Sequence, residues 1–167
     1  MTKIVLRALE PEDLDLLYTI ENDRTLWQVG TATAPYSRYL LHDYMAHAIG
    51  DAYADKQVRM VIETENRESV GLVDIFNFSP QHRRAEVGIA VLEAYRQQGI
   101  GQQALAQLSE YARCTLRIHQ LYAIVSETNP EALALFHAAG FKTKTVLADW
   151  IYDGEKYGKA FLLQTFL

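Results

Sequence analysis

The residues with the clearest chemical potential form the turn Arg-Gln-Gln-Gly-Ile-Gly at positions 96–101. A strand-like run, 84–91, precedes this turn, and an amphipathic segment, 102–117, follows it. The turn would therefore open a helix, whose first N–H groups have no intrahelical partners and lie at its positive end. Glycine lets the main chain approach a ligand closely, and the Arg96 guanidinium can add a forked, charged contact. This arrangement is typical of a site that binds phosphate groups.

Two better-known phosphate motifs do not fit the sequence. In a Rossmann fold the glycine turn follows the first strand, whereas here it follows several predicted strands. A Walker loop needs Lys and then Ser or Thr directly after its last glycine, but Gly101 is followed by Gln102. The phosphate site must therefore belong to a different mixed arrangement of helices and strands.

The pattern of apolar residues predicts the elements that position this turn. Alternating segments predict strands, and segments with a 3.6-residue period predict helices. Short polar turns between consecutive strands indicate an antiparallel meander ahead of the glycine turn. We expect an α/β (α+β) fold in which residues 1–167 form a single domain. The predicted strands cover residues 4–9, 58–64, 70–78, 85–91, 121–125, 141–151 and 157–167, and the predicted helices begin at Pro11 and Pro130 or cover 38–49 and 102–117.

Composition limits the class of protein. The chain has 167 residues, of which 49% are apolar and 22% charged, as in an ordinary globular domain. It has no run of about 18 apolar residues, which a membrane-spanning helix needs, and its N-terminus becomes charged too early for a signal peptide. A net charge of −5 gives no basic surface for nucleic acid. We expect a cytoplasmic protein with no nucleic-acid partner and no membrane partner.

Side chains that commonly bind metals form no recognisable pattern. The five histidines are not at metal-ligand spacing, and Cys114 is the only cysteine. We therefore expect no metal and no intramolecular disulfide. Because Cys114 falls within the predicted helix 102–117, we expect it to be packed as a small apolar residue.

Two motifs resemble those of the GNAT family of N-acetyltransferases, and the resemblance covers nearly the whole chain. The turn at 96–101 is similar to the family's Gln/Arg-x-x-Gly-x-Gly/Ala loop for the pyrophosphate of acetyl-CoA. Residues 129–136, Asn-Pro-Glu-Ala-Leu-Ala-Leu-Phe, are similar to its Asn-x-x-Ala-x-x-Leu-Tyr helix, and Gly140 and Phe141 follow at the helix end. Within the family, the chain resembles the branch of spermidine and ribosomal-protein N-acetyltransferases at residues 6–13, 82–86 and 153–157.

The resemblance implies a mixed, mostly antiparallel sheet flanked by helices. In this fold strand 85–91 would carry a bulge and splay away from strand 121–125, and acetyl-CoA would pair with the freed strand edge. The pyrophosphate would lie on the turn 96–101. The residues that would contact the cofactor are Ile89, Ala90, Val91, Arg96, Gln97, Gln98, Gly99, Ile100, Gly101, Gln102, Asn129 and Phe136.

Acetyl transfer needs a base for the amine and a proton for the leaving thiolate. Glu86, near the start of strand 85–91, is the candidate catalytic base, and the alternative role for it is a salt-bridged carboxylate. Many family members protonate the thiolate with the tyrosine of the Leu-Tyr pair, but this chain has Phe136 at that position. Ser126, Tyr122 or solvent could supply the proton instead.

Two functions follow from these features. The first is an N-acetyltransferase that moves the acetyl group of acetyl-CoA to a primary amine of a small molecule, a polyamine or a protein N-terminus. The second, motivated by Phe136, is a non-catalytic acyl-CoA-binding or regulatory module on the same fold. Related polyamine enzymes carry acids before a Pro-Tyr pair, but residues 31–34 contain none, which weakens a polyamine acceptor. The apolar C-terminal strand, 157–167, predicts a homodimer.

Overall fold

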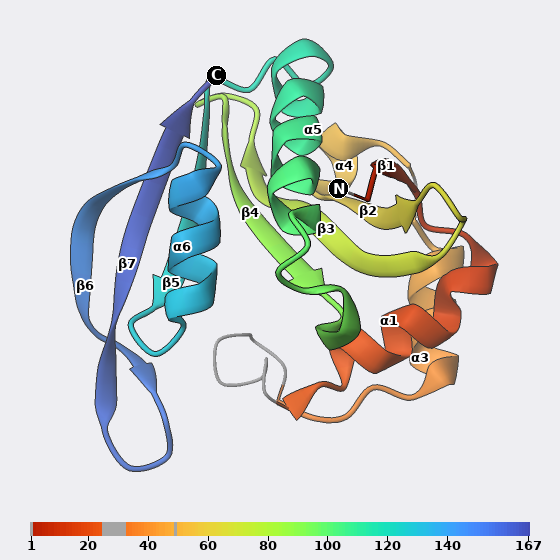
Figure 1. The fold of residues 1–167 in the computed structure, drawn as a ribbon, viewed down its shortest axis with the longest axis horizontal. Helices are drawn as coiled ribbons and strands as arrows, with labels where there is room; N and C mark the ends of the chain where they lie inside the picture. Colours follow the sequence, from red (N-terminus) through yellow and green to blue (C-terminus); the bar gives the residue numbers. More distant parts are fainter. Residues whose placement is uncertain (1, 25–32, 49) are drawn as a thin grey trace.

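A computed structural model describes residues 2–24, 33–48 and 50–167. In this part of the chain the strands form one seven-stranded sheet in the order β1-β2-β3-β4-β5-β7-β6 (Figure 1). The strands are β1 (Ile4–Ala8), β2 (Val58–Thr64), β3 (Ser69–Ser79), β4 (Arg84–Val91), β5 (Gln120–Ser126), β6 (Lys142–Tyr152) and β7 (Tyr157–Phe166). The helices are α1 (Leu14–Glu21), α3 (Arg38–Ala46), α4 (Ala52–Asp55), α5 (Ile100–Cys114) and α6 (Pro130–Ala138).

Strands β2, β3 and β4 form the predicted antiparallel meander, and β1, which helices separate from β2 in the chain, pairs antiparallel with β2. Arg67 and Arg83 take the left-handed backbone conformation in the turns that follow β2 and β3, with φ of 63° and 50°. The chain then crosses over through α5, so that β5 returns parallel to β4. This order confirms the mixed, mostly antiparallel fold.

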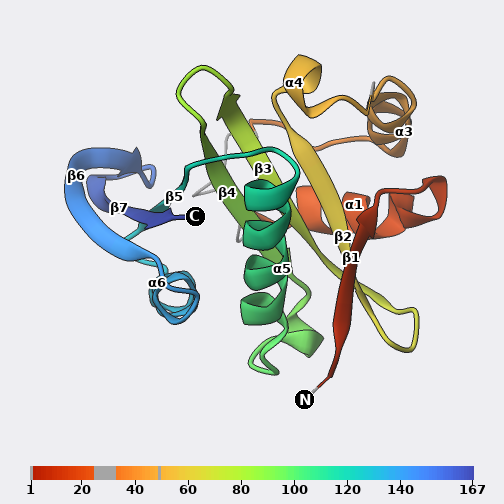
Figure 2. The ribbon, with the colours of Figure 1, turned by 90° about the horizontal axis from the view of Figure 1, so that it is seen from above.

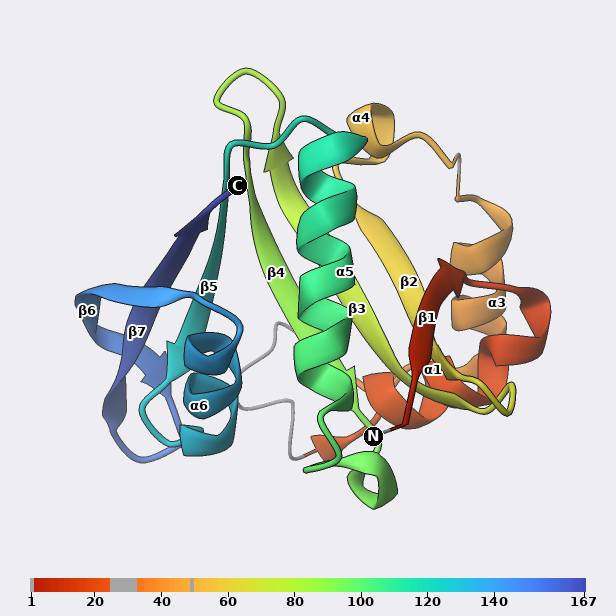
Figure 3. The same ribbon diagram turned by 45° about the horizontal axis from the view of Figure 1, so that its top comes forward.

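Helices cover both faces of the sheet. Helix α5 lies along one face of β1 to β4, and α1 and α3 cover the other (Figures 2 and 3). The alternation of strand residues accounts for both layers. Val61 and Leu72 pack with buried residues of α1 and α3, whereas Ile62 and Val73 belong to the cluster that includes α5.

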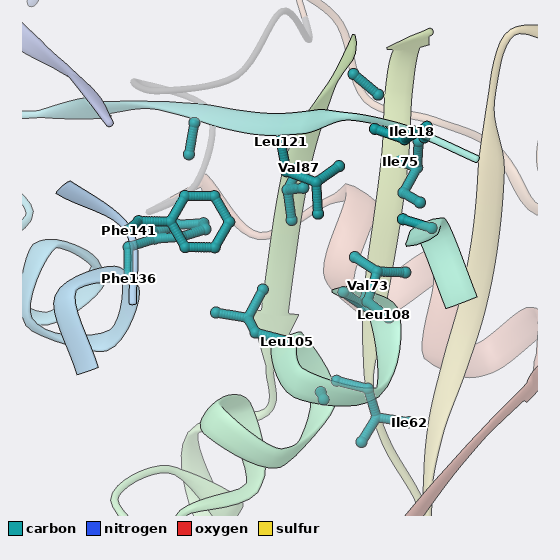
Figure 4. Close-up of a cluster of buried hydrophobic side chains, with 14 of the residues drawn as sticks. Ile62, Val73, Ile75, Val87, Leu105, Leu108, Ile118, Leu121, Phe136 and Phe141 are labelled. Atoms are coloured by element: carbon teal, nitrogen blue, oxygen red, sulfur yellow. The ribbon is translucent and has the colours of Figure 1, made fainter. Parts of the chain in front are cut away.

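The larger core joins α5 and α6 to the sheet (Figure 4). Leu105 and Leu108 of α5 are almost fully buried. They form the apolar face of the segment 102–117, whose pattern predicts an amphipathic helix. Burying one such side chain stabilises a fold by about 1.5–3 kcal/mol. Because this core anchors α5, it also fixes the turn before α5 relative to β4 and β5.

Helix boundaries differ from the prediction at several places. A short 3-10 helix, Pro11–Asp13, precedes α1, and α5 ends at Cys114 rather than at residue 117. Helix α5 begins at Ile100 rather than at residue 102, because the Ile100 side chain is buried in the core and only 1% exposed. Helix α3 ends at Ala46, and the short helix α4 follows it without having been predicted. Residue 49, the end of the predicted helix 38–49, lies outside the described residues.

Two further expectations are wrong. Strand β7 has no free edge for a partner strand, because it lies between β5 and β6 and pairs with both. Cys114 is exposed, and its thiol donates to Glu110 Oε1 over 3.1 Å. The apolar stripe of α5 runs through Leu105, Leu108 and Ala112, so the helical period turns Cys114 away from the core.

Candidate functional site

The site is centred on a fork between the two parallel strands of the sheet. Beyond Glu86 and Tyr122, the last residues that pair these two strands, β4 continues beside β3 and β5 continues beside β7. Figure 1 shows β4 and β5 diverging from that point. Among the described residues, no strand pairs with one edge of β4 beyond Glu86, which confirms the predicted splay. Strands β4 and β5 pair only at Arg84 with Gln120, Ala85 with Leu121, and Glu86 with Tyr122.

The free edge of β4 includes Ile89, Ala90 and Val91, the predicted contacts for the cofactor arm. Gly71 of β3 lies opposite Val91, and a Cβ atom added to Gly71 would lie 2.4 Å from the Ala90 carbonyl oxygen. Any side chain at Gly71 would push the end of β4 out of place. Sequence reasoning missed this role, although a glycine inside a strand pattern is a signal of close backbone approach.

The predicted bulge lies in a different strand. The pairing of β3 with β4 is regular from Gly71 to Phe76 and shifts between Phe76 and Ser79. The extra residue therefore belongs to β3, opposite Ala85, and not to β4 as expected. The physical reason is local: Asn77 in β3 has a left-handed backbone, with φ of 48°.

The turn after β4 presents its main chain at the start of α5. Gln97 and Gly99 are both left-handed, with φ of 60° and 76°, and Gly99 is the N-cap of α5. The first backbone bond of this helix runs from the Gln103 N–H to the Gly99 carbonyl over 3.2 Å. The N–H groups of Ile100, Gly101 and Gln102 precede that bond, so they lie at the positive helix end where an anion binds.

Several side chains of this turn fasten it in place. Arg96 Nε donates to the Val91 carbonyl over 2.9 Å, and so ties the turn to the end of β4. Gln98 Nε2 donates to the Ala94 carbonyl over 3.1 Å. Gln102 Nε2 donates to the Ala138 carbonyl over 3.2 Å, which joins α5 to the end of α6. These bonds give Arg96, Gln98 and Gln102 a structural role beside any ligand contact.

Gly101 has a second function that the motif alone did not reveal. A Cβ atom added to Gly101 would lie 3.0 Å from Leu135 Cδ2 on α6. The glycine therefore lets α5 and α6 approach each other, and it does not act through the phosphate site alone. Ile100 likewise offers only its main chain to a ligand, because its side chain is in the core.

Helix α6 places the remaining predicted cofactor residues. Asn129 Oδ1 accepts the Ala132 N–H over 3.0 Å, which is the expected N-cap bond, and Pro130 follows as the first helical residue. Phe136 is only 4% exposed and meets Phe141 edge to face, with 5.0 Å between ring centroids (Figure 4). Phe136 is thus a core residue with little surface for a ligand.

Glu86 occupies the last rung of the fork and is half-buried. Asn77 Nδ2 donates to Glu86 Oε2 over 2.9 Å. Burial raises the pKa of the Glu86 carboxyl, while hydrogen bonds from Asn77 and Tyr122 act in the opposite direction. Among the described residues its recorded partners are thus an amide and a phenol rather than a cation, so the geometry favours a base over a salt-bridged carboxylate.

The other proposed proton donors differ in their placement. Ser126 is 4% exposed, and its hydroxyl bonds Thr128 Oγ1 over 2.8 Å and accepts the Thr128 N–H over 3.2 Å. Ser126 therefore closes the turn between β5 and α6. Tyr122 lies opposite Glu86, and burial raises the pKa of its hydroxyl, as does the neighbouring carboxylate.

A half-buried ion network continues the face of the sheet that carries Glu86. Arg59 of β2 donates from Nε to Asp74 Oδ1 and from one terminal nitrogen to Glu21 Oε1, each over 2.7 Å. Burial lowers the pKa of Arg59, but the charge and hydrogen bonds of Asp74 and the charge of Glu21 outweigh it and raise that pKa overall. Asp74 in turn pairs across the sheet with Gly88, two residues from Glu86.

A hollow of about 820 Å³ lies at the end of β5, between the turn after that strand and the β6–β7 hairpin. Glu127, Asp153 and Glu155 contribute carboxylates to its lining, and Lys156 contributes one positive charge. Glu127 Oε1 accepts the Lys159 N–H over 2.8 Å, and Asp153 Oδ1 accepts the Lys156 N–H over 2.9 Å. The hollow is therefore net acidic and has a fixed main-chain frame.

Some predicted features fall outside this description. Residues 31 and 32 of the acid-free stretch 31–34 lie outside the described residues. No group of three or more potential metal-ligating side chains occurs in the part of the chain that the structure describes. None of the helices placed by the structure combines the length and the apolar character that crossing a bilayer requires.

Comparison with protein families gives one clear match. The model of the "Acetyltransferase (GNAT) domain" matches residues 3–142. Among characterised proteins, the spermidine N(1)-acetyltransferase of Vibrio cholerae is 25% identical over 158 residues, which is 93% of this chain and 88% of that protein. The spermidine N(1)-acetyltransferase of Escherichia coli is 27% identical over 158 residues, 94% of this chain and 82% of that protein.

Solved structures agree with the family match in their fold. The spermidine N-acetyltransferase from Vibrio cholerae in complex with CoA and spermine has a TM-score of 0.85 and 25% identity, and the alignment covers 98% of this chain and 95% of that one. A dodecameric structure of spermidine N-acetyltransferase from Vibrio cholerae has a TM-score of 0.83 and 24% identity, with coverage of 98% and 93%.

Proposed function

Because the chain belongs to the GNAT acetyltransferase family and is an N-acetyltransferase that uses acetyl-CoA, we propose that it acetylates a primary amine of a polyamine at the fork between β4 and β5. The single observation that carries the site assignment is the position of Glu86. It is a half-buried carboxylate with neutral recorded partners on the last rung before β4 and β5 part. A base at that point lies beside the free strand edge along which the donor would bind.

The residues around the fork fit acetyl-CoA. Gly71 lets the end of β4 lie close to β3, so its free edge stays in place for the amide groups of the cofactor arm. The N–H groups of Ile100, Gly101 and Gln102 lie at the positive end of α5 for the pyrophosphate. We assign Ile89, Ala90 and Val91 to the arm and residues 96–102 to the pyrophosphate. Asn129 would act mainly as the N-cap of α6, and Phe136 mainly as a core residue.

The chemistry at the fork follows from these assignments. Glu86 accepts a proton from the acceptor ammonium, directly or through water, and so frees the nitrogen lone pair. Acetyl-CoA, when bound, would supply an acetyl thioester whose C–S bond breaks as the C–N bond to the amine forms; sulfur leaves as thiolate, and the proton that the nitrogen loses on forming the amide passes to solvent. A main-chain N–H on the free edge of β4 polarises the carbonyl oxygen during this step.

Phe136 does not rule out turnover. A thiol with a pKa near 8.5 leaves as a tolerable thiolate near neutral pH. A general acid typically adds about 10²–10⁴-fold, so its absence slows the reaction without ending it. Tyr122 and solvent remain available as proton sources, whereas Ser126 is engaged in a turn.

A polyamine is the acceptor class with the most support. The characterised relatives of known activity are spermidine N(1)-acetyltransferases, and the hollow beside β5 carries three carboxylates and one lysine. Carboxylates replace the hydration of a polycation. The absence of acids at residues 31–34 points the other way, so a small monoamine and a protein N-terminus serve as the competing acceptors. We also propose a cytoplasmic location, because the only cysteine is a free thiol on the surface.

A panel of amines tests this proposal. We expect the protein to release CoA thiol with spermidine or spermine and to be slower with amino sugars, amino acids and N-terminal peptides. Phe136→Tyr is assayed in parallel and is expected to be as fast as the parent or faster, because the family accommodates a hydroxyl there. If neither protein acetylates any amine while both bind acetyl-CoA, the non-catalytic binding module becomes the better description.

We further propose that the chain forms a homodimer through the β6 edge and the β6–β7 hairpin. Strand β6 is the last strand of the sheet, and most of its residues are exposed. Val146, Trp150, Tyr152 and Tyr157 are each at least half exposed, and such a surface is apolar enough to pack against a second copy. The dodecameric structure of the Vibrio cholerae protein shows that a chain of this fold can assemble.

Light scattering in solution tests the dimer. We expect a mass of at least twice that of one chain, and Trp150→Lys is expected to lower it to that of a monomer by placing a charge on the apolar edge. Tyr39→Lys is the matched control, because Tyr39 is an exposed aromatic residue on α3, away from the hairpin. A monomeric parent at working concentration would rule this interface out.

A further inference from the structure

The turn end of the β3–β4 hairpin contains an irregularity next to the proposed base. Phe76 pairs with Glu86 and Ser79 pairs with Arg84, so β3 has one more residue than β4 between these two pairs. Asn77 begins the irregular stretch with φ of 48°. A left-handed backbone is uncommon outside glycine, and asparagine is one of the few residues that adopt it readily. The bulge is therefore specified by the residue type at position 77.

The bulge changes the direction of a side chain. In a regular strand Asn77 would point to the opposite face from Phe76, because successive side chains alternate. Phe76 is the residue paired with Glu86, so a regular Asn77 would point away from that carboxylate. Instead, Asn77 Nδ2 lies 2.9 Å from Glu86 Oε2. Re-aiming a side chain beside an active site is a known use of β-bulges.

The rest of the strand keeps its ordinary packing around this point. Phe78 is only 3% exposed and packs with the Tyr53 ring at 5.4 Å between centroids. Nothing in the core therefore requires Asn77 itself, whose side chain is exposed apart from its bond to Glu86. The backbone of Asn77 thus shapes the bulge, while its side-chain amide contacts the Glu86 carboxylate.

We propose that Asn77 is a positioning residue for Glu86, and that the bulge in β3 serves to bring its amide to that carboxylate. The inference rests on the proposed role of Glu86 as the base. Asn77 binds the carboxylate from β3, and Tyr122 binds it from β5. Together these two hydrogen bonds hold the Glu86 carboxylate at the fork between β4 and β5. Arg84 is a nearby cation, and its charge lowers the pKa of the Tyr122 hydroxyl.

The hydrogen bonds from Asn77 and Tyr122 both affect the pKa of Glu86. An N–H that donates to a carboxylate favours the charged form and lowers its pKa. Burial has the opposite and larger effect on Glu86, so Asn77 limits a rise that burial would otherwise make greater. Removing the amide should raise the pKa of Glu86 further. Because Asn77 is exposed, its bond is screened by solvent, so we expect a modest rise.

Two variants separate the amide from the backbone it occupies. Asn77→Gly keeps the left-handed conformation without strain and removes the side chain. Asn77→Asp keeps the shape and replaces the donor by a second carboxylate, which should raise the Glu86 pKa more. Gln81→Ala, in the exposed turn of the same hairpin, is the control for a surface change.

The decisive measurement is the pH profile of kcat/KM with an amine that the parent acetylates. We expect the acid limb to move modestly to higher pH in Asn77→Gly and further in Asn77→Asp, with an unchanged KM for acetyl-CoA and a parent-like profile for Gln81→Ala. A parent-like profile in Asn77→Gly would overturn the proposal, as would a loss of rate that follows a loss of thermal stability with no shift of the limb.

A second readout does not depend on turnover. The carboxyl carbon of Glu86 can be titrated by NMR in the parent and in Asn77→Gly, and its midpoint should rise in the variant. An unchanged midpoint would overturn the proposal even if activity fell. A raised midpoint in a protein that acetylates no amine would uphold the positioning role and reject Glu86 as a base.

Discussion

Gly99→Asp is expected to weaken acetyl-CoA binding severely and to leave the fold intact. Gly99 is the N-cap of α5 with φ of 76°, and aspartate is tolerated in this conformation better than most residues. A carboxylate also interacts well with the positive helix end. The new carboxylate would therefore leave α5 in place while repelling the pyrophosphate from the N–H groups that should bind it.

The size of this effect follows from simple electrostatics. Two like charges about 4 Å apart at an effective dielectric constant of 20 repel by about 4 kcal/mol. That energy corresponds to an increase of about a thousandfold in Kd. Salt and water around the exposed turn screen the repulsion, so we expect an increase in Kd of about a hundredfold or more. Isothermal titration with acetyl-CoA measures the loss, and the melting temperature reports the fold.

Gly99→Asn is the matched control for this prediction. It has nearly the same size and backbone preference as the aspartate variant but no charge, so it should lose much less affinity. Gly101→Asp is a poorer test, because a Cβ at Gly101 would lie 3.0 Å from Leu135 and disturb the packing of α5 against α6. Parent-like affinity in Gly99→Asp would place the pyrophosphate elsewhere.

Glu86→Gln is expected to lower the rate of acetyl transfer by about 10²–10⁴-fold, the usual contribution of a general base. Glutamine keeps an oxygen that can accept from Asn77, so the geometry of the fork is retained. What is lost is the ability to take a proton from the amine. The loss should be largest below the pKa of the amine, where nearly all of the acceptor is protonated.

The pH dependence gives the sign of the effect. Burial raises the pKa of Glu86 above its ordinary value, so the base is charged above that pKa and the parent rate falls as the pH drops through it. In Glu86→Gln this acid limb should vanish, and the rate should follow the fraction of neutral amine. A primary amine such as that of lysine has a pKa near 10.4, so the variant rate should still be rising at pH 9.

The control for this variant is Glu65→Gln, which removes an exposed carboxylate in the turn after β2. Its kcat and pH profile should match those of the parent. The assay compares initial rates of thiol release for the three proteins between about pH 5 and pH 9, a range that spans the titration of a carboxyl with a raised pKa. If Glu86→Gln stays within about twofold of the parent across this range, well below the contribution of a general base, Glu86 is not the base.

The features that could be predicted from the sequence are those decided within a few residues. The left-handed glycine at position 99 and the open N–H groups after it depend on a turn of six residues. The start of α6 depends on Asn129 and Pro130, which cap and open that helix without help from elsewhere. The strand pattern likewise follows from local alternation, and so the order of elements could be anticipated, whereas the fork was expected only from the family resemblance.

Other features depend on which segments meet in three dimensions. Gly71 and Gly101 matter because of the Ala90 carbonyl and Leu135, contacts that no motif at either glycine contains. Strand β7 looked like a free edge because it is apolar and ends the chain, but β6 folds back outside it and becomes the edge. Cys114 looked buried because its helix is amphipathic, but its position on the helix surface turns it outward.

The proposed catalytic centre shows the same division. The sequence by itself determined that Glu86 begins a strand leading to a phosphate turn, since strand and turn are neighbours in the chain. Only the tertiary structure decided that Tyr122, 36 positions later, lies opposite Glu86 on the last paired rung, and that an extra residue in β3 turns Asn77 toward it. Local conformational preferences fix where elements begin and end, whereas register and bulges arise when distant strands pair, and these set the partners and the pKa of the carboxylate.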